Sequence, residues 1–188
     1  LKSRSFDVGF NPWSNGLDSS FFLSFCKNFL FYKDFDRPQV INHYQVVRRY
    51  LKLPEKSWRI NKLNLKKDYS KILICPQSTD NRRNITNEEL DKLILDYIGI
   101  YSHPQITIAS MDKTYFRDGC KSFYLEKSFK SSKLFLSIIK NSSLVVCSDS
   151  GPLHIALALK KDLIVIMKST KPENVVNTGS CLAIKNLN

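Results

Sequence analysis

The sequence has no apolar run long enough to cross a lipid bilayer. Runs such as Leu163 to Met167 are far shorter than the roughly 20 residues that a membrane-spanning helix needs. The first ten residues also lack the apolar core of a secretory signal peptide. We therefore expect a cytoplasmic protein that has at most peripheral contact with the inner membrane.

The sequence also has no pair of cysteines at metal-ligand or redox spacing. Its five cysteines lie far apart (Cys26, Cys75, Cys120, Cys147 and Cys181), with no histidine at ligand distance from any of them. An odd, unpatterned set of cysteines is typical of a reducing compartment and excludes a disulfide framework. We expect neither a zinc site nor another metal.

Acidic residues are few in comparison with basic ones. There are 29 Lys and Arg residues against 17 Asp and Glu, which gives a net charge of +12. Such a protein is attracted to phosphates, whether on nucleotides, nucleic acids or an anionic membrane. The lysines are spread along the chain and no nucleic-acid-binding signature is present, so we expect no nucleic-acid partner.

The first third of the chain gives a weak structural pattern. Residues 6–10 predict a short strand, and residues 19–29, apolar almost throughout, predict a helix on the basis of their length. Residues 42–53 predict an amphipathic helix that ends before Pro54. The polar, lysine-rich segment 55–69 predicts a linker, which divides the chain into domains at 1–64 and 65–188.

From Lys71 onward, strands and helices alternate. Continuous Val, Ile and Leu runs predict a parallel sheet covered on both faces, and hence an α/β, doubly wound fold. The predicted strands are 72–75, 105–109, 123–125, 144–147, 163–167 and 181–184. The predicted helices are 86–97, capped by Thr86, then one capped by Ser131 or Ser132 that ends at Lys140, and 152–159.

The segment 148–154, Ser-Asp-Ser-Gly-Pro-Leu-His, joins a predicted strand to a helix. In a doubly wound sheet, ligands bind at the carboxyl ends of strands. Gly151 allows close approach of the backbone, and the N–H groups of Gly151, Leu153 and His154 form an anion site that suits a pyrophosphate. The alternative is that Asp149 or Ser150 only caps the helix and that His154 is a buried, hydrogen-bonded histidine.

The longer segment SDSGPLHIALALKKDLIVIMKST, 148–170, resembles the C-terminal signature of the family 9 glycosyltransferases, the ADP-heptose:lipopolysaccharide heptosyltransferases. The segments ILICPQSTDNRRNITNEELDKLI and FDVGFNPWSNGLDSSFFLSF resemble earlier units of that family. The resemblance implies a GT-B fold, in which two Rossmann-like domains face a cleft. Residues 1–64 would then be part of the acceptor-side domain, and residues 65–188 would be the nucleotide-sugar-binding domain.

The resemblance also implies the residues that bind the donor. The diphosphate and the adjacent sugar would contact Asp149, Ser150, Gly151, Pro152, Leu153 and His154. The remaining donor-binding residues would be Ser78 and Thr79, then Arg82 or Arg83 to neutralise the leaving phosphates, Asp112 for the ribose hydroxyls, and Thr170. Asp112 has an equally good interpretation as a turn-forming aspartate.

The sequence departs from the family pattern at several places, and one of them is Arg82-Arg83-Asn84, which replaces a tryptophan-containing element. The glycine–aspartate loop that carries the family's general base has no counterpart here, and Asp18 fits a helix N-cap better. We therefore expect the base to lie outside this chain, which is either a fragment or a divergent member. The family's Gly-Pro-Thr turn is replaced by Lys168-Ser169-Thr170.

These patterns favour an inverting glycosyltransferase that moves heptose from ADP-heptose to a lipopolysaccharide core acceptor, with no cofactor and no metal. The alternative from another class is a catalytically silent paralogue, a scaffold module that still binds a nucleotide or phosphate. A nucleotide-sugar epimerase would need further carboxylates in the cleft, and none is identified. A nucleic-acid-binding role is the weakest hypothesis.

Overall fold

The computed structural model describes residues 6–11, 26–31, 48, 51–52, 60–175 and 179–184. The chain divides into two compact units. One comprises Leu1–Trp58 with Glu173–Asn177, and the other comprises Arg59–Pro172 with Thr178–Asn188. The described part of the first unit contains two parallel strands, β1 (Phe6–Asn11) and β2 (Cys26–Phe31), with Phe6 opposite Cys26.

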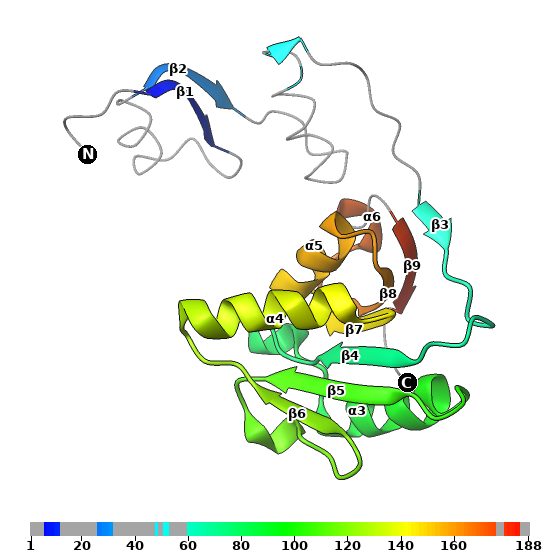
Figure 1. Ribbon diagram of the computed structural model, residues 1–188. Helices are drawn as coiled ribbons and strands as arrows, with labels where there is room; N and C mark the ends of the chain where they lie inside the picture. Colours follow the sequence, from blue (N-terminus) through cyan, green and yellow to red (C-terminus); the bar gives the residue numbers. More distant parts are fainter. Residues whose placement is uncertain are drawn as a thin grey trace. The chain divides into compact units, whose positions relative to one another are not determined.

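The second unit is built on a parallel sheet of seven strands (Figure 1). The order across the sheet is β3-β9-β8-β7-β4-β5-β6. The strands are β3 (Ile60–Lys62), β4 (Lys71–Cys75), β5 (Gln105–Ser110), β6 (Lys121–Tyr124), β7 (Leu144–Ser148), β8 (Asp162–Ile166) and β9 (Gly179–Ile184). From β4 the chain adds β5 and β6 on one side of it, which completes one edge of the sheet. It then returns to the other side of β4 and adds β7, β8 and β9 in the opposite direction. The switch in direction therefore lies between β4 and β7.

Helices cover both faces of this sheet. The helix α3 (Asn87–Leu93), continued by the π-helical turn η2 (Ile94–Ile98), lies on one face. The helices α4 (Phe129–Asn141) and α5 (Gly151–Ala158) lie on the other (Figure 1). Ile72 and Ile74 share a buried cluster with Leu90, and the intervening Leu73, also fully buried, points to the opposite face. The predicted α/β, doubly wound sheet is confirmed.

The start of α3 follows the sequence, whereas the start of α4 does not. Thr86 Oγ1 accepts the Glu89 N–H at 3.2 Å, and the Glu89 carboxylate accepts the Thr86 N–H at 2.7 Å, which forms a capping box. The predicted caps of α4, Ser131 and Ser132, are wrong. The cap is Ser128, whose Oγ accepts the Ser131 N–H at 3.1 Å, while the buried Ser131 hydroxyl accepts the Glu126 N–H.

Two other differences, and one prediction that lies mostly outside the described residues, concern the first part of the chain. The predicted helix 19–29 is wrong at its end, since residues 26–31 form β2, and a short apolar run does not distinguish strand from helix. Residues 19–25 lie outside the described residues, as does most of the predicted helix 42–53, of which Arg48 and Leu51 are helical. Within the predicted linker 55–69, Ile60–Lys62 form β3 beside β9.

Three short elements were not predicted from the sequence. They are the 3₁₀ turns η1 (Asn81–Arg83) and η3 (Lys113–Tyr115) and the helix α6 (Pro172–Val175). Two cysteines, Cys75 and Cys147, lie opposite each other on β4 and β7, and burial raises the pKa of both thiols. Within the described residues, no helix is long and apolar enough to span a membrane.

Candidate functional site

Two of the predicted loops meet at the carboxyl ends of β4 and β7. The chain leaves β7 at Ser148 and enters α5 at Gly151, while residues 76–80 lead from β4 into η1. Ser78 Oγ donates a hydrogen bond to the Asp149 carbonyl at 3.2 Å, and Arg83 Nη1 lies 3.3 Å from Asp149 Oδ2. The site therefore lies at the switch point, where doubly wound sheets bind ligands.

The N-terminus of α5 is not capped by a side chain. Ser150 occupies the N-cap position, but its hydroxyl donates to the Ser148 carbonyl at 3.2 Å. The Leu153 N–H donates to the Ser150 carbonyl at 3.0 Å, so this group, which the sequence suggested as an anion ligand, already has a partner. Gly151 is exposed, and a Cβ added to it would meet no atom within 4 Å. The first turn of α5 therefore opens onto free space.

Asp149 is a nearly buried carboxylate that the protein satisfies only in part. Its side chain is 5% exposed, and Oδ2 receives no hydrogen bond from any described residue, although Arg83 is close. Buried carboxylate oxygens normally have hydrogen-bond donors. Asp149 therefore retains the capacity to accept a hydrogen bond, and it depends on Arg83 for charge compensation.

Asp80 organises both arginines and was not identified from the sequence. Its Oδ1 accepts from the Arg82 N–H and Nε at 3.1 and 3.0 Å, and its Oδ2 accepts from Arg82 Nη2 at 2.8 Å. Asp80 Oδ2 also lies 3.6 Å from Arg83 Nε. Arg82 is 84% exposed and bound to Asp80, whereas Arg83 lies between Asp80 and Asp149. The structure thus distinguishes the two candidates, because Arg83 alone reaches the α5 turn.

The hydrogen bonds from Arg82 lower the pKa of Asp80 to about 2. Because the folded pKa lies below the ordinary value of about 3.9, this pairing stabilises the loop above pH 4 and is lost as pH falls through about 2. We predict that NMR titration of the Asp80 carboxyl carbon gives a midpoint near 2, and that Arg82→Gln raises it, because the side-chain hydrogen bonds are lost while the backbone N–H of residue 82 still donates. A midpoint near 4 in the unmodified protein would contradict this prediction.

Other predicted residues have local structural roles. Ser78 is fixed by its N–H, which donates to Asn84 Oδ1 at 2.7 Å, and Thr79 is exposed beside it. Asp112 is exposed and caps η3, since Oδ1 accepts the Thr114 N–H at 2.9 Å, and this bond lowers the pKa of Asp112. The interpretation of Asp112 as a turn-forming aspartate is therefore confirmed. Its carboxylate also lies just after the carboxyl end of β5, at the edge of the sheet where the predicted ligand would bind.

Gln77, which sequence reasoning missed, joins the ends of β4 and β5. Its Oε1 accepts from the Ser110 hydroxyl and from the Met111 N–H, both at 2.7 Å. The only sequence signal is its place directly after the Cys75-Pro76 end of an apolar strand. Gln77 thus holds the Asp112 loop against the loop that carries Ser78.

The turn after β8 is tied to α3. Lys168 Nζ, which stands where the family has a glycine, lies 2.6 Å from Glu89 Oε2, and both side chains are mostly buried. Among the described residues, no hydrogen bond or ion pair joins Lys168 or Thr170 to Asp149. His154 is exposed on α5, so the buried-histidine interpretation is wrong. Its side chain is available to a ligand.

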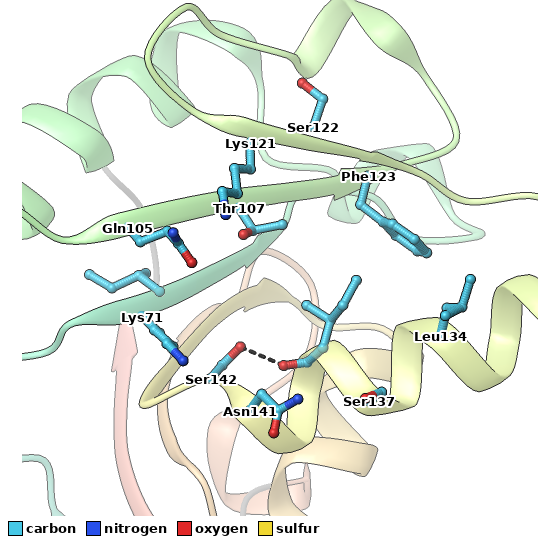
Figure 2. Close-up of a pocket in the computed structure, with 12 residues that line it drawn as sticks. Lys71, Gln105, Thr107, Lys121, Ser122, Phe123, Leu134, Ser137, Asn141 and Ser142 are labelled. Carbon is cyan, nitrogen blue, oxygen red and sulfur yellow. Dashed lines mark hydrogen bonds between the residues drawn. The ribbon is translucent and has the colours of Figure 1, made fainter.

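A cavity of about 380 Å³ lies away from this site, between α4 and the amino-terminal part of the sheet. Figure 2 shows Lys71, Thr107, Lys121, Phe123 and Leu134 around it. Within the described ranges, no group of three or more His, Cys, Asp or Glu side chains could hold a metal ion. The sequence has one Asp-x-Asp spacing, Asp34 to Asp36, which lies outside those ranges.

Comparison with known proteins is consistent with this geometry. The sequence pattern of glycosyltransferase family 9 (heptosyltransferase) matches residues 133–182, and no curated protein sequence matches the chain. Among solved structures, E. coli heptosyltransferase WaaC with ADP aligns with a TM-score of 0.64 and 13% identity, over 96% of this chain and 67% of WaaC.

Two further structures give the same result. E. coli ADP-heptose LPS heptosyltransferase II aligns with a TM-score of 0.63 and 13% identity, over 95% of this chain and 68% of that protein. A glycosyltransferase family 9 protein from Veillonella parvula aligns with a TM-score of 0.62 and 12% identity, over 87% and 53%. The chain thus spans 53% to 68% of the lengths of these three proteins. The predicted resemblance is confirmed: residues 133–182 carry the pattern of glycosyltransferase family 9 on the α/β fold of the heptosyltransferases.

Proposed function

We propose that the chain is the donor-binding part of an inverting glycosyltransferase that moves heptose from ADP-heptose to a lipopolysaccharide core acceptor. The observation that carries this proposal is the nearly buried Asp149 beside Arg83, at the uncapped start of α5. In the related structures the nucleotide is ADP in WaaC, and the donor named for heptosyltransferase II is ADP-heptose. We assign no residue of this chain as the general base.

The proposed reaction places negative charge on the leaving diphosphate. The Gly151 N–H and the positive end of α5 stabilise that charge. Pro152 suits the first turn of the helix, because an N–H at that position would have no partner within the helix. Arg83 lies between Asp80 and Asp149, and from beside Asp149 its guanidinium would also donate hydrogen bonds to the phosphates. The protein's own donors thus neutralise the leaving group.

The remaining residues bind the sugar and the nucleoside. Asp149 accepts a hydrogen bond from a sugar hydroxyl, and the exposed His154 donates to the sugar or a phosphate. Asp112 lies at the carboxyl end of β5, where it would contact the ribose. Supporting contacts come from Ser78, Thr79, Arg82, Ser150 and Thr170, whereas Leu153, which is buried and whose N–H is bound to the Ser150 carbonyl, only holds α5 in place.

The acceptor and the location of the protein are part of the same proposal. A lipopolysaccharide core carries phosphates and lies at a membrane, and a net charge of +12 favours both. The proposed protein works in the cytoplasm, at the inner face of the membrane.

One observation favours the second candidate, a silent nucleotide- or phosphate-binding module. Lys168 replaces the family's glycine, and its ammonium is already paired with Glu89. A turn that lacks the glycine has less room for a phosphate beside its backbone. A module of this kind would bind a nucleotide and transfer nothing.

Calorimetric titration with ADP, UDP and GDP tests the proposal. We expect selective binding of ADP, which the Asp149→Asn, His154→Ala double variant loses and the exposed Asp96→Asn variant keeps. No binding of any nucleotide by a folded sample would show that residues 149–154 only begin a helix. Release of ADP from ADP-heptose in the presence of an acceptor then separates the transferase from the silent module.

A further inference from the structure

The outward side of α4 combines lysines with exposed apolar side chains. Phe129, Lys133, Leu136 and Lys140 follow one another at spacings of four, three and four residues, which places them in one line along the helix. Phe129 is 86% exposed and Leu136 is 37% exposed, and both lysines are exposed. We call these four residues, together with the neighbouring Lys130, the α4 face.

The opposite side of α4 already supplies the contacts that fix the helix to the sheet. Ile139 is fully buried, and Phe135 stacks on Phe123 of β6, with ring centroids 6.4 Å apart and planes 9° from parallel. The apolar residues of the α4 face are therefore not needed for the core. Exposure of a phenylalanine to water is unfavourable in free energy, and contact with an apolar phase would remove this penalty.

The charge of the α4 face is unbalanced. The acidic side chain nearest to it in sequence is Glu126, the only acid between residues 119 and 148. Among the described residues, no acidic side chain pairs with Lys130, Lys133 or Lys140. On the other face of the sheet, α3 and η2 carry four acids and one lysine, namely Glu88, Glu89, Asp91, Asp96 and Lys92. The α4 face is thus basic, whereas α3 and η2 are acidic and two of their acids, Glu89 and Asp91, are paired with Lys168 and Arg117.

The cavity beneath α4 extends this basic, apolar character. Leu134, which is exposed on the flank of α4, forms part of its wall together with Phe123. The exposed Lys71 and Lys121 also line it, from the starts of β4 and β6 (Figure 2). The region beside the α4 face therefore offers two more cations and an apolar surface, and these match a phosphate headgroup and the start of an acyl chain.

We propose that the α4 face docks on an anionic phospholipid membrane. The lysines contact headgroup phosphates, while Phe129 and Leu136 enter the boundary between headgroups and acyl chains. The aliphatic Leu136, in the same line as the lysines, favours a lipid over a nucleic acid, because a nucleic-acid duplex is bound mainly by cations and a single strand stacks its bases on aromatic rings. The inference concerns a surface apart from Asp149 and holds whether or not the chain transfers a sugar.

Sedimentation of the full chain with vesicles tests this inference. Vesicles of phosphatidylglycerol mixed with phosphatidylcholine are compared with vesicles of phosphatidylcholine alone. Each lysine near such a surface contributes a factor of about five, so Lys133→Gln with Lys140→Gln should weaken binding about 30-fold. Phe129→Ala should weaken it about tenfold, through loss of apolar area withdrawn from water.

The matched control lies on the acidic side of the sheet. Lys92→Gln with Leu95→Ala removes an exposed lysine and a leucine that is 73% exposed, and it should leave vesicle binding unchanged. Equal binding to both vesicle types, or an equal loss in the control, would overturn the inference. It would also be overturned if the lysine variants lost binding while Phe129→Ala did not, because the face would then recognise phosphates alone, as a nucleic-acid-binding surface does.

Discussion

Gly151→Val should abolish nucleotide binding and leave the fold as stable as before. A Cβ added at Gly151 meets no atom of the protein within 4 Å, so the start of α5 has room for a side chain in the free protein. Valine is also a better helix former than glycine. Its methyl groups would occupy the space in front of α5 into which the proposed diphosphate fits. We expect the affinity for ADP to fall at least about 100-fold, or about 2.7 kcal/mol.

The measurement combines calorimetric titration with thermal unfolding followed by circular dichroism. Ala158→Val is the matched control, because it adds the same side chain at an exposed position near the other end of α5. It should leave the affinity unchanged and should lower the stability by no more than about 0.7 kcal/mol, since alanine is the better helix former. If Gly151→Val bound ADP as well as the unmodified protein does, no diphosphate would approach the start of α5, and the proposed donor site would be wrong.

Leu153→Ala should have the largest effect on stability. Leu153 is fully buried on α5, which packs against β7 and β8. Truncation of a buried leucine leaves a cavity and typically costs about 2–5 kcal/mol. Urea unfolding followed by circular dichroism measures the loss, with Leu95→Ala as control, since that side chain is mostly exposed and its truncation should cost less than about 0.5 kcal/mol.

These two variants on one helix separate binding from folding. Leu153→Ala should lower the urea midpoint, and the fraction that stays folded should still bind ADP. Gly151→Val should instead keep the urea midpoint and lose the binding of ADP. A loss below about 1 kcal/mol for Leu153→Ala would mean that α5 is held mainly by other contacts. The start of α5 would then be less rigid than the proposed diphosphate site requires.

The strands from β4 onward were predictable because a parallel strand that is buried on both faces is a continuous apolar run. Ile72–Cys75 and Leu144–Cys147 both have that form. β3 was missed because Ile60-Asn61-Lys62 has one apolar residue and forms only by pairing with β9. The start of β2 was predicted to be helical because a short apolar run shows neither the helical nor the strand repeat of apolar residues. It forms a strand because it pairs with β1, and that pairing is not visible in the local sequence.

In the candidate site, too, features formed by neighbouring residues could be predicted, whereas contacts between residues far apart in the sequence could not. The position of Asp149 to His154 between β7 and α5 could be predicted because a strand, two small residues, a proline and a helix are contiguous in sequence. The roles of Arg82 and Arg83 could not be separated, because the Asp149 carboxylate that selects Arg83 is far from it in the sequence, in the loop after β7. Asp80 did have a local signal, an acid two residues before an arginine, whereas the pairing of Lys168 with Glu89 had none.

The pairing of β3 with β9 sets the order in which the sheet can be completed during synthesis on the ribosome. Residues 60–62 are synthesised before residues 179–184, but among the described strands β3 pairs with β9 alone. Until β9 has been made, β8 is the open edge of the sheet, and its buried residues Leu163 to Ile166 are unprotected on that side. Such an edge is the kind that pairs with other chains. β9 therefore covers the apolar edge that β8 would otherwise expose, and it also holds β3 in the sheet.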